Sequence, residues 1–168
     1  LNTMLCAGSG GSAIFVVATR LAQFNGAQCR SPEVGINGLL GALVASCAAA
    51  DVMQPIEAVF TGVFAALAVW LTEHALVRLR IDDVVGAFPV HGVGGLVGIV
   101  AAACVAKSEA TLGVQLLGAA AIGGGVFLAV YLPLRLLAPT AWLRVRREDE
   151  RRGLTEDEHG GQAEIQVL

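Results

Sequence analysis

Long runs of apolar residues alternate with short polar stretches along most of the chain. A helix that crosses the hydrocarbon core of a bilayer needs about 20 mostly apolar residues, within a range of roughly 17 to 25. Five runs have this length, so we expect an all-α membrane protein with a helical transmembrane domain over residues 1–141. The expected helices cover about 1–19, 34–50, 57–77, 84–106 and 110–134.

The pattern changes at Trp142. From Trp142 to the last residue, 12 of 27 residues are Asp, Glu or Arg, whereas the whole chain is only 15% charged. Ordinary soluble domains carry about 25% charged residues, so the deficit of charge lies in residues 1–141. We expect residues 142–168 to form a tail outside the membrane, for which a solvated chain end is the simplest interpretation.

The basic residues predict how the helices are oriented. Lysine and arginine are retained on the cytoplasmic side of a membrane. With five crossings, ten of the 11 basic residues lie on one side and only Lys107 lies on the other. This distribution predicts a multi-pass protein of the cell membrane with a cytoplasmic C-terminus. The ten are Arg20, Arg30, Arg78, Arg80, Arg135, Arg144, Arg146, Arg147, Arg151 and Arg152.

The apolar pattern also argues against several classes of function. Residues 8–13 fit the nucleotide-binding pattern GxGxxA, but they continue into an apolar run, and a nucleotide site needs a preceding strand and a solvent-facing crevice. The four cysteines have neither CxxC nor metal-ligand spacing, and His91 has no HExxH partner. We therefore expect no enzyme activity, cofactor, metal site or nucleic-acid partner.

The start of the chain does not resemble a secretory signal peptide. The first 19 residues are apolar, but they contain no basic leading segment and no small-residue cleavage site. We expect Leu1 to lie inside a longer protein.

Glycines are concentrated in two of the predicted helices. Gly94 and Gly98 form a GxxxG pair in the fourth, and Gly118 and residues 123–125 crowd the fifth. Helices in lipid associate by close approach of their backbones, so small residues mark the faces that contact other helices. We therefore expect a tightly packed bundle.

His91 is the candidate functional residue. It lies eight residues after Asp83, about 12 Å along a helix, which predicts an imidazole near the middle of the membrane. Polar groups at that depth face a bundle interior or a transport pathway. The expected neighbours on its face are Ala87, Gly94 and Gly95, whose small size leaves room for a permeating molecule. The alternative is a core histidine hydrogen-bonded to a neighbouring helix.

Three groups of residues resemble, in order and spacing, motifs of the ammonium transporter (Amt/Mep/Rh) family. The group that resembles DDPxGAxxxHGxxG consists of Asp82, Asp83, Gly86, Ala87, His91 and Gly92. The group that resembles the NGxLAG start of the eighth helix consists of Asn37, Gly38, Leu39 and Leu40. The group that resembles the tail motif consists of Leu143, Arg144, Val145, Gly153, Leu154, His159 and Gly160.

This resemblance implies the last five of the eleven transmembrane helices of an ammonium transporter, followed by its cytoplasmic tail. It implies that His91 is the second of two hydrogen-bonded histidines in a narrow hydrophobic pore. Asp82 and Asp83 then lie at the cytoplasmic end of its helix, where a carboxylate caps the helix or assists transport. The resemblance also implies ammonium or ammonia as substrate, a homotrimer among membrane lipids, and a PII-type signal protein at the cytoplasmic face.

A neutral pore fits this substrate. Moving an ammonium ion into a medium of low dielectric constant costs tens of kcal/mol in the ideal case. Removing its proton costs only roughly 3 kcal/mol, because the pKa of ammonium lies about two units above neutral pH. A neutral imidazole can both donate and accept a hydrogen bond, so it can pass a proton or hold ammonia.

Four residues depart from the family motifs. Val84 replaces a proline, Pro89 is unexpected two residues before His91 and is predicted to kink the helix, and Thr155 and Gly161 replace an Asp and a Glu in the tail. The first pore histidine and the external cation site resemble features of earlier helices, so we expect this chain to be inactive alone. A non-transporting membrane sensor or scaffold of the same fold is the alternative.

Overall fold

The computed structural model describes residues 1–24, 33–105 and 111–138. These residues form helices joined by short turns and contain no strand, which confirms the all-α prediction. The elements are α1 (Asn2–Phe24), α2 (Glu33–Ser46), α3 (Pro55–Leu79), the π-helix η1 (Phe88–Val93), α4 (Gly94–Cys104) and α5 (Leu112–Leu137). The predicted tail lies outside the described residues.

The second helix is shorter than predicted, because it ends at Ser46 and not at Ala50. The Ser46 hydroxyl donates to the Leu43 carbonyl at 2.7 Å, and turns follow in which the Ala49 N–H donates to Ser46 and the Met53 N–H to Ala49. Ala49 and Met53 are buried. The apolar run therefore continues as a turn whose Ala49 and Met53 side chains are buried, which hydrophobicity alone cannot distinguish from helix.

The fourth segment becomes helical at Ala87, three residues later than predicted. Gly86 has a φ of +65°, and a right-handed helix does not contain a residue with positive φ. Residues 84–86 therefore form a turn before the helix. Together, η1 and α4 cover Phe88–Cys104.

Three helices are long and apolar enough to cross a membrane by length and composition. They are α1 over Asn2–Leu21, α3 over Pro55–Leu79 and α5 over Leu112–Leu137. The 14 residues of α2 are about 21 Å long, less than the roughly 30 Å of a hydrocarbon core. Two of the five predicted spans are thus shorter helices in this chain.

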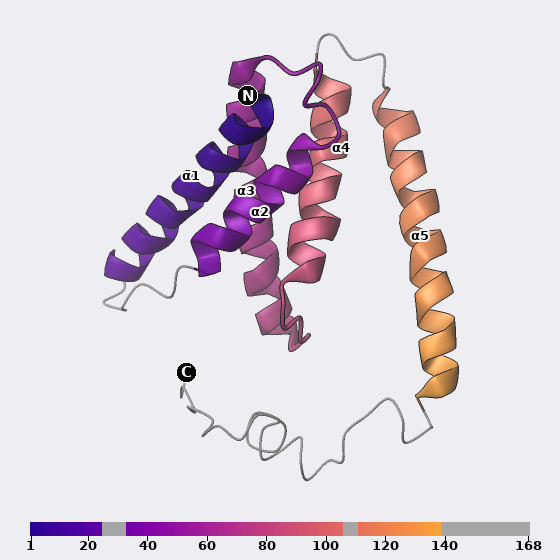
Figure 1. The fold of residues 1–168 in the computed structure, drawn as a ribbon. Helices are drawn as coiled ribbons and strands as arrows, with labels where there is room; N and C mark the ends of the chain where they lie inside the picture. The colour runs from indigo at the N-terminus through magenta and orange to yellow at the C-terminus, as the bar shows by residue number, and fades with distance from the viewer. Residues whose placement is uncertain (25–32, 106–110, 139–168) are drawn as a thin grey trace. The chain divides into compact units, whose positions relative to one another are not determined.

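Contacts divide the chain into one unit of Leu1–Ala121 and another of Ile122–Leu168. In the first unit, α1, α2, α3 and the η1–α4 segment run in alternating directions (Figure 1). The Asn2 side-chain amide donates to the carbonyls of Ala50 and Met53, at 3.0 and 2.6 Å. These bonds hold the start of α1 beside the turn between α2 and α3.

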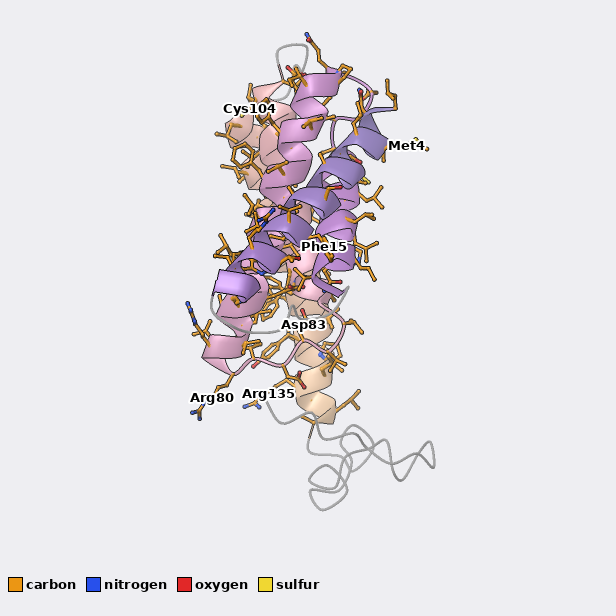
Figure 2. The ribbon with its side chains drawn as sticks, turned by 90° about the vertical axis from the view of Figure 1, so that its left-hand side faces the viewer. Met4, Phe15, Arg80, Asp83, Cys104 and Arg135 are labelled. Atoms are coloured by element: carbon orange, nitrogen blue, oxygen red, sulfur yellow. The ribbon has the colours of Figure 1, made fainter. Side chains whose placement is uncertain are left out.

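The opposite end of this unit carries basic residues. Figure 2 shows Arg80 and Asp83 at that end, and Met4 and Cys104 at the other. Arg20 is near the end of α1 and Arg78 near the end of α3, so both lie at the Arg80 end. The structure thus groups these arginines as the charge pattern requires, while the side of the membrane that they face stays a prediction.

The core between α1 and α3 is built from very small side chains. Ala58, Gly62 and Ala66 follow one another at intervals of four residues and are buried. A Cβ added to Gly62 would press on the Cys6 carbonyl oxygen and lie 2.6 Å from Ser9 Oγ. Such close approach is how helices associate when lipid tails are as apolar as their side chains.

The close packing predicted for Gly94 and Gly98 is confirmed. A Cβ added to Gly94 would lie 2.9 Å from the Gly41 carbonyl oxygen of α2. A Cβ added to Gly98 would press on the Ala45 carbonyl oxygen and lie 2.8 Å from the Ala45 Cα. Backbone therefore meets backbone along this side of α4.

Helix α5 is described by itself. It has 26 residues, none of them buried, with Pro133 inside the helix, and the Phe127 and Tyr131 rings stack with centroids 5.2 Å apart. A Cβ added to Gly118 or to the glycines at 123–125 would meet no described atom within 4 Å. The packing predicted for these glycines stays a prediction.

Candidate functional site

The site begins at the carboxylate of Asp83, which caps the helix that carries His91. The Ala87 N–H donates to Asp83 Oδ1 at 3.0 Å, and the Phe88 N–H donates to Asp83 Oδ2 at 2.8 Å. The first N–H groups of a helix have no partner within it, and negative charge is favoured at that end. Of the two candidate caps, Asp83 makes these bonds, whereas Asp82 is exposed.

A tight turn joins this cap to the helix. The Gly86 N–H donates to the Asp83 carbonyl at 3.1 Å, and the Gly86 carbonyl accepts from the Val90 N–H at 3.0 Å. Gly86 takes a positive φ, which glycine adopts at little cost because it has no Cβ.

The first helical turns are wider than an α-helix. The Gly94 N–H points to the carbonyls of both Pro89 and His91. The bond to the Pro89 carbonyl spans five residues, which is the spacing that defines a π-helix. Pro89 is buried in the first turn, where an N–H would lack a helical partner in any case. The predicted kink within a long helix is therefore wrong, because the helix starts next to the proline.

His91 lies on the side of η1 that the other helices of the unit leave uncovered. Its side chain is exposed, as is that of Ala87 one turn earlier. Gly94 is buried against α2, and a Cβ on Gly95 would be 3.8 Å from Val44 Cγ1. Ala87 thus shares the exposed side with His91, whereas Gly94 belongs to the packing between helices.

The depth of His91 follows from its neighbours in the chain. A Cβ on Gly86 would be 3.6 Å from Glu73 Oε1. Gly94 packs on Gly41 of α2, which in turn lies against Val69. His91 stands between Gly86 and Gly94. Its level therefore lies between Glu73 and Val69 of α3. The midpoint of α3 is two residues before Val69, which puts His91 about 3 to 9 Å from that midpoint.

Sequence reasoning missed one polar contact beside this site. The Asn37 side-chain amide donates to Glu73 Oε1 at 2.7 Å, and both side chains are partly buried. The available signal was a polar residue in each of two predicted membrane helices, which is a costly placement. Nothing in the two segments indicated that these residues face each other.

The chemistry available at the site is hydrogen bonding through the imidazole of His91. Within the residues that the structure describes, no three His, Cys, Asp or Glu side chains converge as metal ligands. The imidazole of His91 is the only ring on its face of η1 with both a donor and an acceptor. This arrangement suits contact with a small polar molecule.

The fold and the site define a polytopic α-helical membrane protein. The model of the Ammonium Transporter Family matches residues 1–164, and the chain belongs to this family. It is 34% identical over 163 residues to a putative ammonium transporter of Synechocystis, sll1017, which covers 95% of this chain and 36% of the relative. It is 31% identical over 137 residues to the ammonium transporter Amt2 of Methanocaldococcus jannaschii, covering 73% of this chain and 31% of the relative.

A solved structure shares the fold. The chain is similar to a Sensor Amt Protein with a TM-score of 0.78 and 27% sequence identity, over 94% of this chain and 40% of that one. This likeness confirms the expected ammonium-transporter fold. The chain spans about a third of the length of the curated relatives described above, and their names are those of transporters.

Proposed function

We propose that this chain is part of a cell-membrane protein that moves ammonium or ammonia across the bilayer, with His91 lining the path. Family membership supports the substrate. The single observation that carries the site is the exposed imidazole close to the middle of the helical unit. A polar group at that depth needs a hydrogen-bonding partner or faces a transport pathway. Within the described part of the chain, the imidazole of His91 makes no hydrogen bond.

The exposed side of η1 then forms one wall of the path. In family-length relatives about two thirds of the protein lies beyond the region matched here. Substrate paths of many transporters lie at the interface between structural repeats. The side of η1 that carries Ala87 and His91 is where the rest of a family-length protein would complete such a path. A chain that forms only one wall of the path does not conduct.

The test of the site is His91→Ala in a family-length protein reconstituted in liposomes. Uptake of methylammonium should fall about tenfold or more. A positioned proton-transfer group typically contributes at least about a hundredfold, and water should take over part of this role in the variant. His74→Ala is the matched control, since His74 is exposed and its Nδ1 lies 2.8 Å from the Trp70 carbonyl of its own helix. Unchanged uptake after loss of the His91 imidazole would refute its role.

The chain alone provides a second test. Liposomes that contain only these 168 residues should take up no more methylammonium than empty liposomes. Uptake that saturates with concentration would overturn the single-wall argument, while leaving the family assignment intact.

A non-transporting sensor is the second candidate, because the solved structure that shares this fold is named a Sensor Amt Protein. A sensor would bind ammonium without net flux. Isothermal titration of the family-length protein with ammonium chloride, alongside the uptake assay, separates the two functions. Saturable binding with no uptake would favour the sensor.

We also propose a homotrimer with a cytoplasmic C-terminus, and a PII-type signal protein as a partner of the tail. Thr155 and Gly161, which depart from the tail motif, lie outside the described residues. Light scattering of the family-length protein in detergent measures the number of subunits. Pull-down with a PII-type protein, repeated after truncation at Trp142, tests the tail.

A further inference from the structure

We propose that Asn37 and Glu73 are positioning residues for His91. With Gly86 they form a polar junction, named here for these three residues, that joins α2 and α3 to the turn before η1. The consequence for transport rests on the proposed function, whereas the positioning itself can be tested without transport.

The junction is a compact contact of three elements. Asn37 of α2 donates to Glu73 of α3 at 2.7 Å. A Cβ added to Gly86 would lie 3.3 Å from Asn37 Nδ2 and 3.6 Å from Glu73 Oε1. The turn therefore packs its backbone directly on the paired polar groups, where a side chain would fit tightly and the positive φ of Gly86 would disfavour it.

The charge of Glu73 makes this contact strong. Hydrogen bonds to an ionised acceptor are shorter and roughly twice as strong as neutral ones, and the low local dielectric of an interior strengthens them further. The same environment penalises a carboxylate that loses one of its hydrogen-bond donors. The pair therefore holds α2 and α3 at a fixed separation beneath Gly86.

A short path leads from the junction to the imidazole. Gly86 is followed by the two N–H groups that Asp83 caps and then by the buried pair Pro89 and Val90. His91 comes next. Because its own ring makes no hydrogen bond within the described residues, its place depends on where the backbone of η1 begins. That beginning is fixed at Gly86, and Gly86 rests on the junction.

Three variants separate this role from general stability. Asn37→Asp removes the donor that Asn37 supplies and sets two carboxylates against each other. Glu73→Gln keeps an acceptor oxygen but makes the hydrogen bond a neutral one, so it should speed exchange at Ala87 and Phe88 less than Asn37→Asp does. The double variant reverses the pair, since a glutamine at 73 can donate to an aspartate at 37. Asn2→Asp makes the same chemical change at the other end of the unit, where Asn2 donates to backbone carbonyls.

The measurement is amide hydrogen exchange of the full chain in detergent micelles, followed at Ala87 and Phe88. Asn37→Asp should speed exchange at these amides about tenfold, the lower range for loss of a hydrogen bond to a charged group. The core amides of Ala65 and Ala66 should keep their rates. The double variant should restore protection, and Asn2→Asp should leave Ala87 and Phe88 unchanged.

Three results would overturn the proposal: unchanged exchange in Asn37→Asp, a rise of equal size at Ala65 and Ala66, or no recovery in the double variant. In a family-length protein, Asn37→Asp should lower the maximal rate of methylammonium uptake with little change in the concentration for half-maximal uptake. The double variant should recover that rate. If the original protein does not conduct, the proposed function fails while the exchange experiment still decides on the junction.

Discussion

The contact between α1 and α3 leaves no space for one additional methyl group at Gly62. In Gly62→Ala the new Cβ would press on the Cys6 carbonyl oxygen and lie 2.6 Å from Ser9 Oγ. A flexible side chain could move aside, but the Cys6 carbonyl is backbone, so the helices must separate. Ser9 Oγ also lies 3.1 Å from the Val59 carbonyl, and that hydrogen bond across the helices is strained or lost.

The expected loss of stability follows from these two effects. Overpacking of a close contact costs typically 1 to 3 kcal/mol, and a hydrogen bond between membrane helices contributes about 0.6 kcal/mol. Gly62→Ala should therefore destabilise the chain by about 2 to 4 kcal/mol. Gly8→Ala is the matched control, because a Cβ there meets nothing within 4 Å and alanine is favoured over glycine in a helix by roughly 0.5 to 1 kcal/mol.

The assay is unfolding of the detergent-solubilised protein by increasing mole fractions of sodium dodecyl sulfate, followed by circular dichroism. The midpoint should fall for Gly62→Ala and should stay or rise for Gly8→Ala. The reasoning is refuted if the two variants shift the midpoint in the same direction, or if Gly62→Ala unfolds at the same point as the original protein.

Two further predictions concern the cap and the cysteines. Asp83→Ala should lower stability by about 1 kcal/mol in the same unfolding assay, because it removes both cap hydrogen bonds. Asp82→Ala removes an exposed carboxylate and should have little effect. Equal effects of the two variants would contradict the cap. In folded protein, maleimide should label the exposed Cys104 and not the buried Cys6, whose thiol donates to a backbone carbonyl at 3.0 Å. Mass spectrometry of the labelled peptides measures which cysteine has reacted. Early labelling of Cys6 would contradict the packing of α1.

The helices and their order could be predicted because hydrophobicity and charge act over whole segments. The close contacts of Gly94 and Gly98 were also predictable, since small residues one turn apart have few other uses in lipid. The end of α2 was not predictable in the same way. Ala49 is buried whether it is in a helix or in a turn, so burial imposes the same residue type on both.

The site was only partly predictable for a related reason. His91 could be singled out because an imidazole within an apolar segment is costly. Its surroundings depend on Gly86, whose positive φ delays the helix, and on the contact between Asn37 and Glu73, which are 36 positions apart in the chain. Local pattern carries no information about that pairing. The role of His91 stays a prediction.

The meeting of backbones at Gly94 and Gly98 has a mechanical consequence. Because the two backbones are in contact there, rolling α4 about its axis would bring bulkier side chains into a gap that has no room for them, so the two helices should move as one stiff pair. Motions of the helical unit would then take place around this pair, not within it.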